Sequence, residues 1–273
     1  LSSRGPDFMD ITLQPADVLK PDILAPGHQI WAAWSPLSAS EPLLTGNMFA
    51  LYSGTSMATP HIVGIAALIK QQNPSWTPAM IASAISTTAT KYDRYGEVIK
   101  SEGYDLTDLI PSTYFDFGAG LVNPALALDP GLVLPSGYDD YIRFLCSLPN
   151  ANHTVIELAT GTCCNGSFGH PADLNLPSVT LSALRGSLTI RRTFYNVGDK
   201  QETYSCSVIQ PNGTKVDVSP TWFTILPKGS QDIYIQFGVV QEASTYSFGE
   251  IVLTGSLNHI LRMPLSVLPI SLY

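Results

Sequence analysis

The sequence Gly-Thr-Ser-Met-Ala-Thr-Pro-His at residues 54–61 runs directly into a mainly apolar stretch at residues 62–69. Residues 48–52 before it predict a short buried strand, and the stretch after it predicts a core helix with apolar side chains on nearly every face. Ser56 therefore stands at a strand-to-helix corner. Unpaired N–H groups and the positive end of the helix dipole can stabilise an oxyanion there. We expect Ser56 to have the position that a serine nucleophile needs.

Other interpretations of Ser56 have to be weighed. Serine is a preferred N-cap, so Ser56 taken alone could serve only to cap the helix. The Gly-x-Ser-x-Gly elbow of α/β-hydrolases has a second glycine where Ala58 stands here, and it needs an acid and a histidine after the serine. His61 follows Ser56 by five positions and points away from it, so we expect a structural histidine bonded to the backbone. The candidate partners for an elbow, none in a recognisable motif, are Asp105, Asp116, His153, His170 and His259.

The octapeptide and the small-residue helix behind it resemble the serine motif of the subtilisin-like serine proteases, the peptidase S8 family. Residues 1–6 and 20–27 resemble the two blocks that precede this motif in plant members, in the same order. The resemblance implies an endopeptidase that cleaves protein or peptide substrates through an acyl-enzyme on Ser56, with Thr55 supporting the oxyanion hole. It implies no cofactor.

The resemblance also implies what should accompany Ser56. In this family the catalytic aspartate and histidine precede the serine along the chain, and the oxyanion asparagine does so too. We therefore expect this chain to be a C-terminal portion that lacks the N-terminal part of its own catalytic domain and is inactive alone. The alternative function is a non-catalytic, secreted adhesion or regulatory module built on the C-terminal β domain.

Periodicity along the chain predicts an α/β part followed by an all-β part. Thr77 and Pro78 predict the N-cap and first residue of a second helix. After residue 173 only strand-length patterns remain, which favours a β-sandwich. We expect the C-terminal part of a subtilisin-like parallel-sheet domain at 1–130, a connector at 131–172 with little to bury, and a fibronectin type III-like sandwich at 173–273. Residues 116–132, 138–146 and 192–198 resemble plant subtilase segments, and strands are predicted at 187–195, 203–209, 216–219, 231–237, 250–253 and 259–267.

Composition excludes several kinds of partner. The 273 residues carry a net charge of −8 and are 45% hydrophobic, with a pI near 4.9. Nucleic-acid binding requires a basic surface, so we expect none. No apolar run is long enough to span a bilayer, and Arg262, Pro264 and Pro269 mark the apolar C-terminus as a terminal strand.

Sequons and cysteines gather after residue 145. Asn152, Asn165 and Asn212 begin Asn-x-Ser/Thr triplets, and we expect a glycan on at least one of them. The four cysteines allow two disulfides in three arrangements, free thiols in a reduced compartment are the alternative, and their spacing does not suit a metal site. The secretion that the resemblance implies, to the cell wall or apoplast, favours a bridge from Cys146 to Cys163 or Cys164. For the remaining cysteine of that pair and Cys206 two alternatives stay open, free thiols or a second disulfide.

Overall fold

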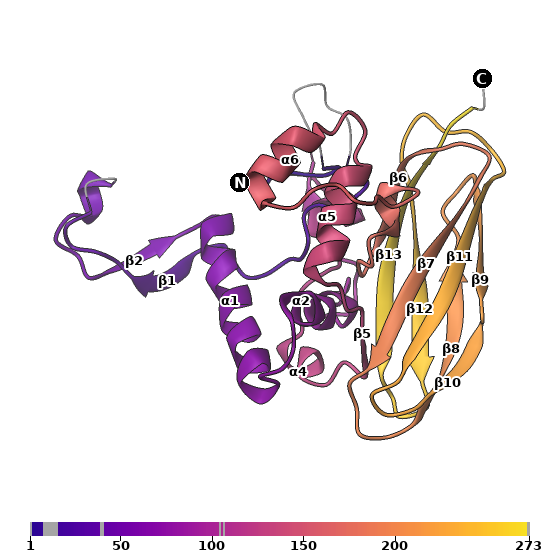
Figure 1. Ribbon diagram of the computed structural model, residues 1–273. Coiled ribbons are helices and arrows are strands. Elements are labelled where there is room, and N and C mark those ends of the chain that lie inside the picture. The colour runs from indigo at the N-terminus through magenta and orange to yellow at the C-terminus, as the bar shows by residue number, and fades with distance from the viewer. Residues whose placement is uncertain (1, 8–15, 39–40, 104, 106, 272–273) are drawn as a thin grey trace.

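The computed structural model describes residues 2–7, 16–38, 41–103, 105 and 107–271. Leu1 of the first family-like block and residues 272–273 of the expected sandwich lie outside this range. A helix-rich N-terminal half stands beside a C-terminal β-sandwich, and a hairpin projects from the N-terminal half on the side away from the sandwich (Figure 1). In the described part of the chain, no helix is long and apolar enough to cross a membrane.

Short elements make up the N-terminal half. The second helix begins as predicted, because the Thr77 side chain accepts a hydrogen bond from the Met80 N–H (3.3 Å) and Pro78 is the first helical residue. Ile69, Ala84 and Ile85 form the centre of the core between the two long helices. The elements are β1 (Ile30–Ala33), the 3-10 helix η1 (Pro42–Leu44), β2 (Phe49–Tyr52), α1 (Thr55–Gln72), α2 (Pro78–Thr87), β3 (Lys100–Glu102), β4 (Leu109–Pro111), α3 (Tyr114–Phe117) and α4 (Pro124–Ala127).

The strand before the serine corner exists, but the prediction that it is buried was wrong. β2 pairs in antiparallel register with β1 to form the projecting hairpin. Ala50 is buried, whereas Phe49 and Leu51 are about half exposed. The reason is that β1 is the one strand paired with β2 among the described residues.

The core helix likewise forms without the all-round burial that we predicted. α1 buries Ile65 and Ile69, whereas Val63 is 61% exposed and Leu68 is 53% exposed. The described residues cover one side of this helix and leave its other apolar side open.

Parallel pairing in the N-terminal half is confined, within the described residues, to a bridge between Leu24 and Leu121. Leu24 donates its N–H to the Gly120 carbonyl (2.8 Å) and accepts from the Val122 N–H (2.9 Å). Thr90 pairs antiparallel with the other side of Leu121. The segment that leads to the serine corner is thereby tied to the end of the N-terminal half.

The expected connector contains more structure than its composition suggested. Its helix α6 was not predicted, and this helix buries none of its residues. A disulfide joins Cys146 at the end of α5 to Cys164, which follows α6. β5 pairs with β7 of the sandwich, so the connector contributes a strand to the C-terminal half. The elements are β5 (Leu132–Val133), α5 (Tyr138–Ser147), α6 (His153–Thr160) and the 3-10 helix η2 (Pro171–Asp173).

The C-terminal half is the predicted β-sandwich. One sheet has the order β10-β8-β12-β13-β6 and the other β5-β7-β11-β9, and β13–β6 is the parallel pair among otherwise antiparallel ones. The two sheets enclose one apolar core, and no helix follows β6 up to residue 271. The strands are β6 (Val179–Leu184), β7 (Ser187–Asn196), β8 (Glu202–Ile209), β9 (Thr214–Ser219), β10 (Trp222–Ile225), β11 (Ser230–Val239), β12 (Ser247–Gly255) and β13 (Ile260–Pro269).

One buried carboxylate joins the two halves. Glu250 of β12 accepts hydrogen bonds from Lys91 Nζ (2.7 Å) and the Tyr114 hydroxyl (3.1 Å), both in the N-terminal half. Arg262 of β13 is a second cation on the same carboxylate, at 3.2 Å. Beside this cluster, Phe115 packs edge-on against Phe248 of β12, with ring centroids 5.1 Å apart.

Candidate active site

Ser56 lies in the first turn of α1 and is exposed. The N-cap of this helix is Gly54, not Ser56, so the capping interpretation of Ser56 does not hold. Within the described residues the Ser56 hydroxyl has no hydrogen-bond partner. An exposed hydroxyl that does not cap the helix and has no hydrogen-bond partner is free to react with a molecule from solution.

The backbone at this corner leaves hydrogen-bond donors unused. Met57 and Ala58 donate their N–H groups to the Gly54 carbonyl, at 3.0 Å and 3.3 Å. The N–H groups of Thr55 and Ser56 have no acceptor among the described residues. Unused N–H groups at the start of a helix, aligned with its dipole, can stabilise a negative oxygen.

Gly54 makes this turn possible. Its φ of 154° lies in a range that side-chain-bearing residues rarely adopt. Its N–H donates to the Gly27 carbonyl (2.8 Å), which anchors the start of α1 to the segment after Leu24. The position of Ser56 is therefore set by backbone contacts on both sides of the corner.

His61 has the structural role that we expected. Its Nδ1 lies 2.9 Å from the carbonyl oxygen of Met57 on the preceding turn of α1. Pro60 lacks an N–H, so it cannot donate to the Ser56 carbonyl as a normal helical residue would. His61 is not positioned as a base for Ser56.

Four of the five acids and histidines considered for an elbow have partners elsewhere, and the fifth, His153, is exposed at the start of α6. Asp105 accepts from Thr107, and Asp116 accepts from the Thr113 N–H at the start of α3 and forms an ion pair with Arg4. His170 accepts from the Ala172 N–H, and His259 contacts Glu202. None of these side chains contacts Ser56 in the described structure.

A cavity of about 660 Å³ lies beside the serine corner, between the Leu24 segment and α1. Gly54, Thr55 and Ala58 line one side of it, and His28 is the histidine among its described lining residues. Nδ1 of His28 lies 3.4 Å from the Ser53 hydroxyl. His28 was not predicted as a site residue, and its place directly after the Pro-Gly turn at 26–27 is the one signal in the sequence that indicates it.

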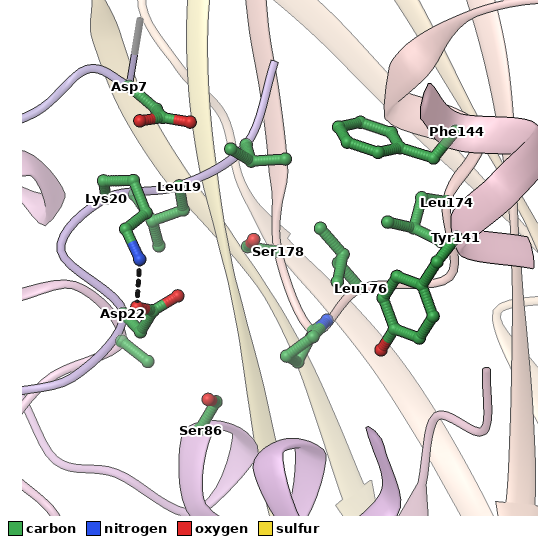
Figure 2. A pocket seen from close by; sticks show the side chains of 13 residues that line it. Asp7, Leu19, Lys20, Asp22, Ser86, Tyr141, Phe144, Leu174, Leu176 and Ser178 are labelled. Atoms are coloured by element: carbon green, nitrogen blue, oxygen red, sulfur yellow. Dashed lines mark hydrogen bonds and ion pairs between the residues drawn. The ribbon is translucent and has the colours of Figure 1, made fainter. Parts of the chain in front are cut away.

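A second cavity, of about 470 Å³, lies between the N-terminal half, α5 and the sandwich. Figure 2 shows Leu19, Phe144 and Tyr141 around it, and the ion pair between Lys20 and Asp22 at its edge. Neither Ser56 nor Thr55 is among its described lining residues. Asp22 lines both cavities, but no described residue of the serine corner lines this one.

Asn152, Asn165 and Asn212 are all exposed. Asn152 caps α6, because its side-chain oxygen accepts from the N–H groups of Thr154 and Val155, and the amide nitrogen that would carry a sugar is not used. The turn at Asn212 differs in one respect: the Thr214 side chain at its third position is buried, and its hydroxyl has no partner among the described groups.

The two cysteines outside the disulfide have different surroundings. Cys163 is exposed, and its thiol donates to a Glu157 carboxylate oxygen (2.9 Å); that hydrogen bond and the negative charge raise the pKa of the thiol. Cys206 is partly buried on β8, and burial raises the pKa of its thiol to about 11. Neither thiol is activated as a nucleophile. Among the described residues, no group of histidines, cysteines and carboxylates is arranged to hold a metal ion.

Comparison with known proteins agrees with the geometry. Residues 1–114 match the model of the subtilase family, and residues 173–267 match a fibronectin type-III domain. Over 266 residues the chain is 65% identical to the subtilisin-like protease SBT2.4 of Arabidopsis thaliana. This match covers 97% of this chain and 32% of that protein. It is 44% identical to SBT2.5 of the same plant over 270 residues, 98% of this chain and 33% of that protein.

The chain thus spans about a third of the length of the curated relatives that it matches. The matches include the serine corner at one end and the sandwich at the other. The chain belongs to the subtilisin-like protease family and carries the serine motif of that family together with a fibronectin type-III domain.

Proposed function

We propose that Ser56 is the nucleophile of a serine endopeptidase that hydrolyses peptide bonds through an acyl-enzyme. The observation that carries the proposal is the exposed, unpartnered hydroxyl of Ser56 beside the unused N–H groups of the first turn of α1. The Ser56 oxygen attacks the scissile carbonyl, and its own N–H with that of Thr55 stabilises the oxyanion that results. The acyl-enzyme is then hydrolysed by water.

The base that removes the proton from Ser56 is proposed to come from a part of the parent enzyme outside this chain. Two observations support this. His61, His170 and His259 have partners elsewhere, His28 lies beside Ser53, and His153 is exposed at the start of α6. The chain also matches only about a third of each relative. The open apolar side of α1, with Val63 and Leu68, is proposed to be covered by that other part.

We propose that the 273-residue chain alone has essentially no peptidase activity. A serine hydroxyl is hardly ionised near neutral pH, and a helix dipole does not remove its proton. In subtilisin, loss of the catalytic histidine lowers turnover on the order of a million-fold. Loss of the oxyanion asparagine costs about a hundred- to a thousand-fold.

A fluorophosphonate probe tests the role of Ser56 directly. The full-length protein should be labelled rapidly, and the label should map to the peptide that contains Ser56. Ser56→Ala should abolish labelling, whereas Ser75→Ala should retain it, because Ser75 is an exposed serine beyond the far end of α1. Labelling that persists in Ser56→Ala would exclude Ser56 as the nucleophile.

The same probe on the 273-residue chain tests where the base lies. We expect no labelling. Rapid labelling at Ser56 would mean that a base is present in this chain, and the variants His28→Gln, His153→Gln, His170→Gln and His259→Gln would then identify it.

Secretion is proposed from the disulfide between Cys146 and Cys164 and the exposed sequons at Asn152, Asn165 and Asn212. The cell wall or apoplast is the compartment that we propose.

A further inference from the structure

The imidazole of His259 lies between two carboxylates from different parts of the molecule. Its Nδ1 is 2.7 Å from Glu202 Oε2, and its Nε2 is 3.3 Å from Asp129 Oδ1. Glu202 is the first residue of β8, and Asp129 lies between α4 and β5. In Figure 1, β5 lies between the helices α2 and α4 and the strands of the sandwich. The ring therefore bridges the sandwich and the segment by which the chain enters it.

Only a protonated ring satisfies both contacts. A neutral imidazole has one N–H and one nitrogen lone pair, whereas the imidazolium has two N–H groups. A neutral His259 would therefore direct a lone pair at one of the two carboxylates. Protonated, it donates to Glu202 and to Asp129 at once.

The surroundings make the buried side of this arrangement rigid. Glu202 is 2% exposed, and its carboxylate also accepts from the Tyr204 hydroxyl (2.6 Å) and the Leu257 N–H (3.0 Å). Gly131 packs so closely that an added Cβ would lie 2.7 Å from His259 Cγ and 2.5 Å from the Tyr204 oxygen. The charged and titratable side chains that face the ring are those of Glu202 and Tyr204 on β8 and Asp129 after α4.

We infer that His259 is a pH-sensitive latch, which holds the 129–131 segment against the sandwich in acid and releases it as the imidazole loses its proton. The inference is independent of the proposed peptidase activity, because it concerns how the two halves are joined. The latch responds only to the binding and loss of a proton at the His259 imidazole.

Titration of His259 fixes the direction. Burial by itself lowers the pKa of His259, but the hydrogen bonds and negative charges of Glu202 and Asp129 outweigh it, so the pKa is raised above its ordinary value of 6.5. A raised folded-state pKa means that the stabilisation is complete below the unfolded-state value and is lost as pH rises through the folded-state value. The 129–131 segment and the sandwich should therefore be held together most firmly at acid pH.

Amide hydrogen exchange in the intact protein tests the latch, with the Val197 amide as the reporter, because its N–H donates to the Gly131 carbonyl (3.1 Å). Comparing His259→Gln with wild type at the same pH cancels the intrinsic pH dependence of exchange. At pH 5 the variant should exchange faster, by about tenfold for each unit by which the folded-state pKa exceeds the unfolded-state one. The ratio should fall as pH rises to 9.

A matched control is His153→Gln, because His153 is exposed at the start of α6 and far in sequence from the junction. It should leave Val197 exchange unchanged at every pH. A His259→Gln ratio that is the same at pH 5 and pH 9, or equal to one at both, would overturn the latch.

A second variant covers the case in which His259→Gln does not fold. Asp129 is 80% exposed at its side chain, so Asp129→Asn should fold and remove only one arm of the latch. Its expected effects are a lower titration midpoint for His259, followed by NMR of the imidazole, and faster Val197 exchange at pH 5. Asp217→Asn is the control, because Asp217 is an exposed aspartate on β9 whose partner is Lys215. An unmoved His259 midpoint in Asp129→Asn would also overturn the proposal.

Discussion

At the scale of the residue, Glu250 places a buried negative charge at the contact between the two halves. Its side chain is 4% exposed and is shared by Lys91, Tyr114 and Arg262. Tyr114 is correspondingly affected: its burial, then the negative charge of Glu250, raises the pKa of its hydroxyl far above the usual range. The phenol therefore stays a hydrogen-bond donor throughout the physiological pH range.

Glu250→Gln should destabilise the protein. The substitution leaves Lys91 and Arg262 partly buried without a counter-charge, and breaking such a pair costs on the order of 3 kcal/mol. Chemical denaturation monitored by Trp fluorescence measures the change. Asp217→Asn is the control, since Asp217 pairs with Lys215 at the exposed surface and should change stability by less than about 1 kcal/mol. Equal effects of the two substitutions would contradict the role given to Glu250.

At the same scale, the position of Ser56 at a strand-to-helix corner could be predicted from the sequence, but its surroundings could not. The octapeptide favours this turn because Gly54 is suited to its unusual φ. The proximity of His28 to Ser53 was not predictable, because it depends on how the Leu24 segment meets the serine corner. Local patterns carry no information on such long-range contacts.

At the scale of the element, the start of α2 and most strands of the sandwich were predicted correctly. Thr77 and Pro78 were identified by their side-chain chemistry, and six strands of the sandwich by apolar alternation. β6 and β10 were missed for physical reasons. β6 is buried at most of its positions and so does not alternate, and β10 has only four residues. α6 was missed because it lies in a polar segment and buries nothing.

Thr77→Ala should weaken the start of α2. The substitution removes the acceptor for the Met80 N–H, and loss of such an N-cap costs about 1 kcal/mol. Thr77→Ser retains the hydroxyl and should lose little. Thermal unfolding followed by circular dichroism compares the two variants, and an alanine variant as stable as the serine variant would show that the cap contributes nothing.

At the scale of the whole molecule, the two-part architecture followed from the change of periodicity near residue 173 together with the family resemblance. The degree of burial did not, because the open sides of β2 and α1 depend on which elements pack there. The limits 130 and 172 of the expected domains remain predictions. β5, inside the expected connector, pairs with β7 and shows that the sandwich draws on residues before 173.

The buried Thr214 side chain has a consequence for the order in which this protein folds and is modified. Glycosyl transfer requires the whole Asn-x-Thr triplet, and here β9 begins at Thr214 and removes its hydroxyl from solvent. A sugar on Asn212 must therefore be attached before the turn between β8 and β9 closes. Asn152 is not restricted in this way, because Thr154 in its triplet is exposed. Glycopeptide mass spectrometry of the secreted protein should then find lower occupancy at Asn212 than at Asn152, because only the Asn212 triplet is closed by folding. Equal occupancy at both sites would mean that occupancy does not depend on closure of this turn.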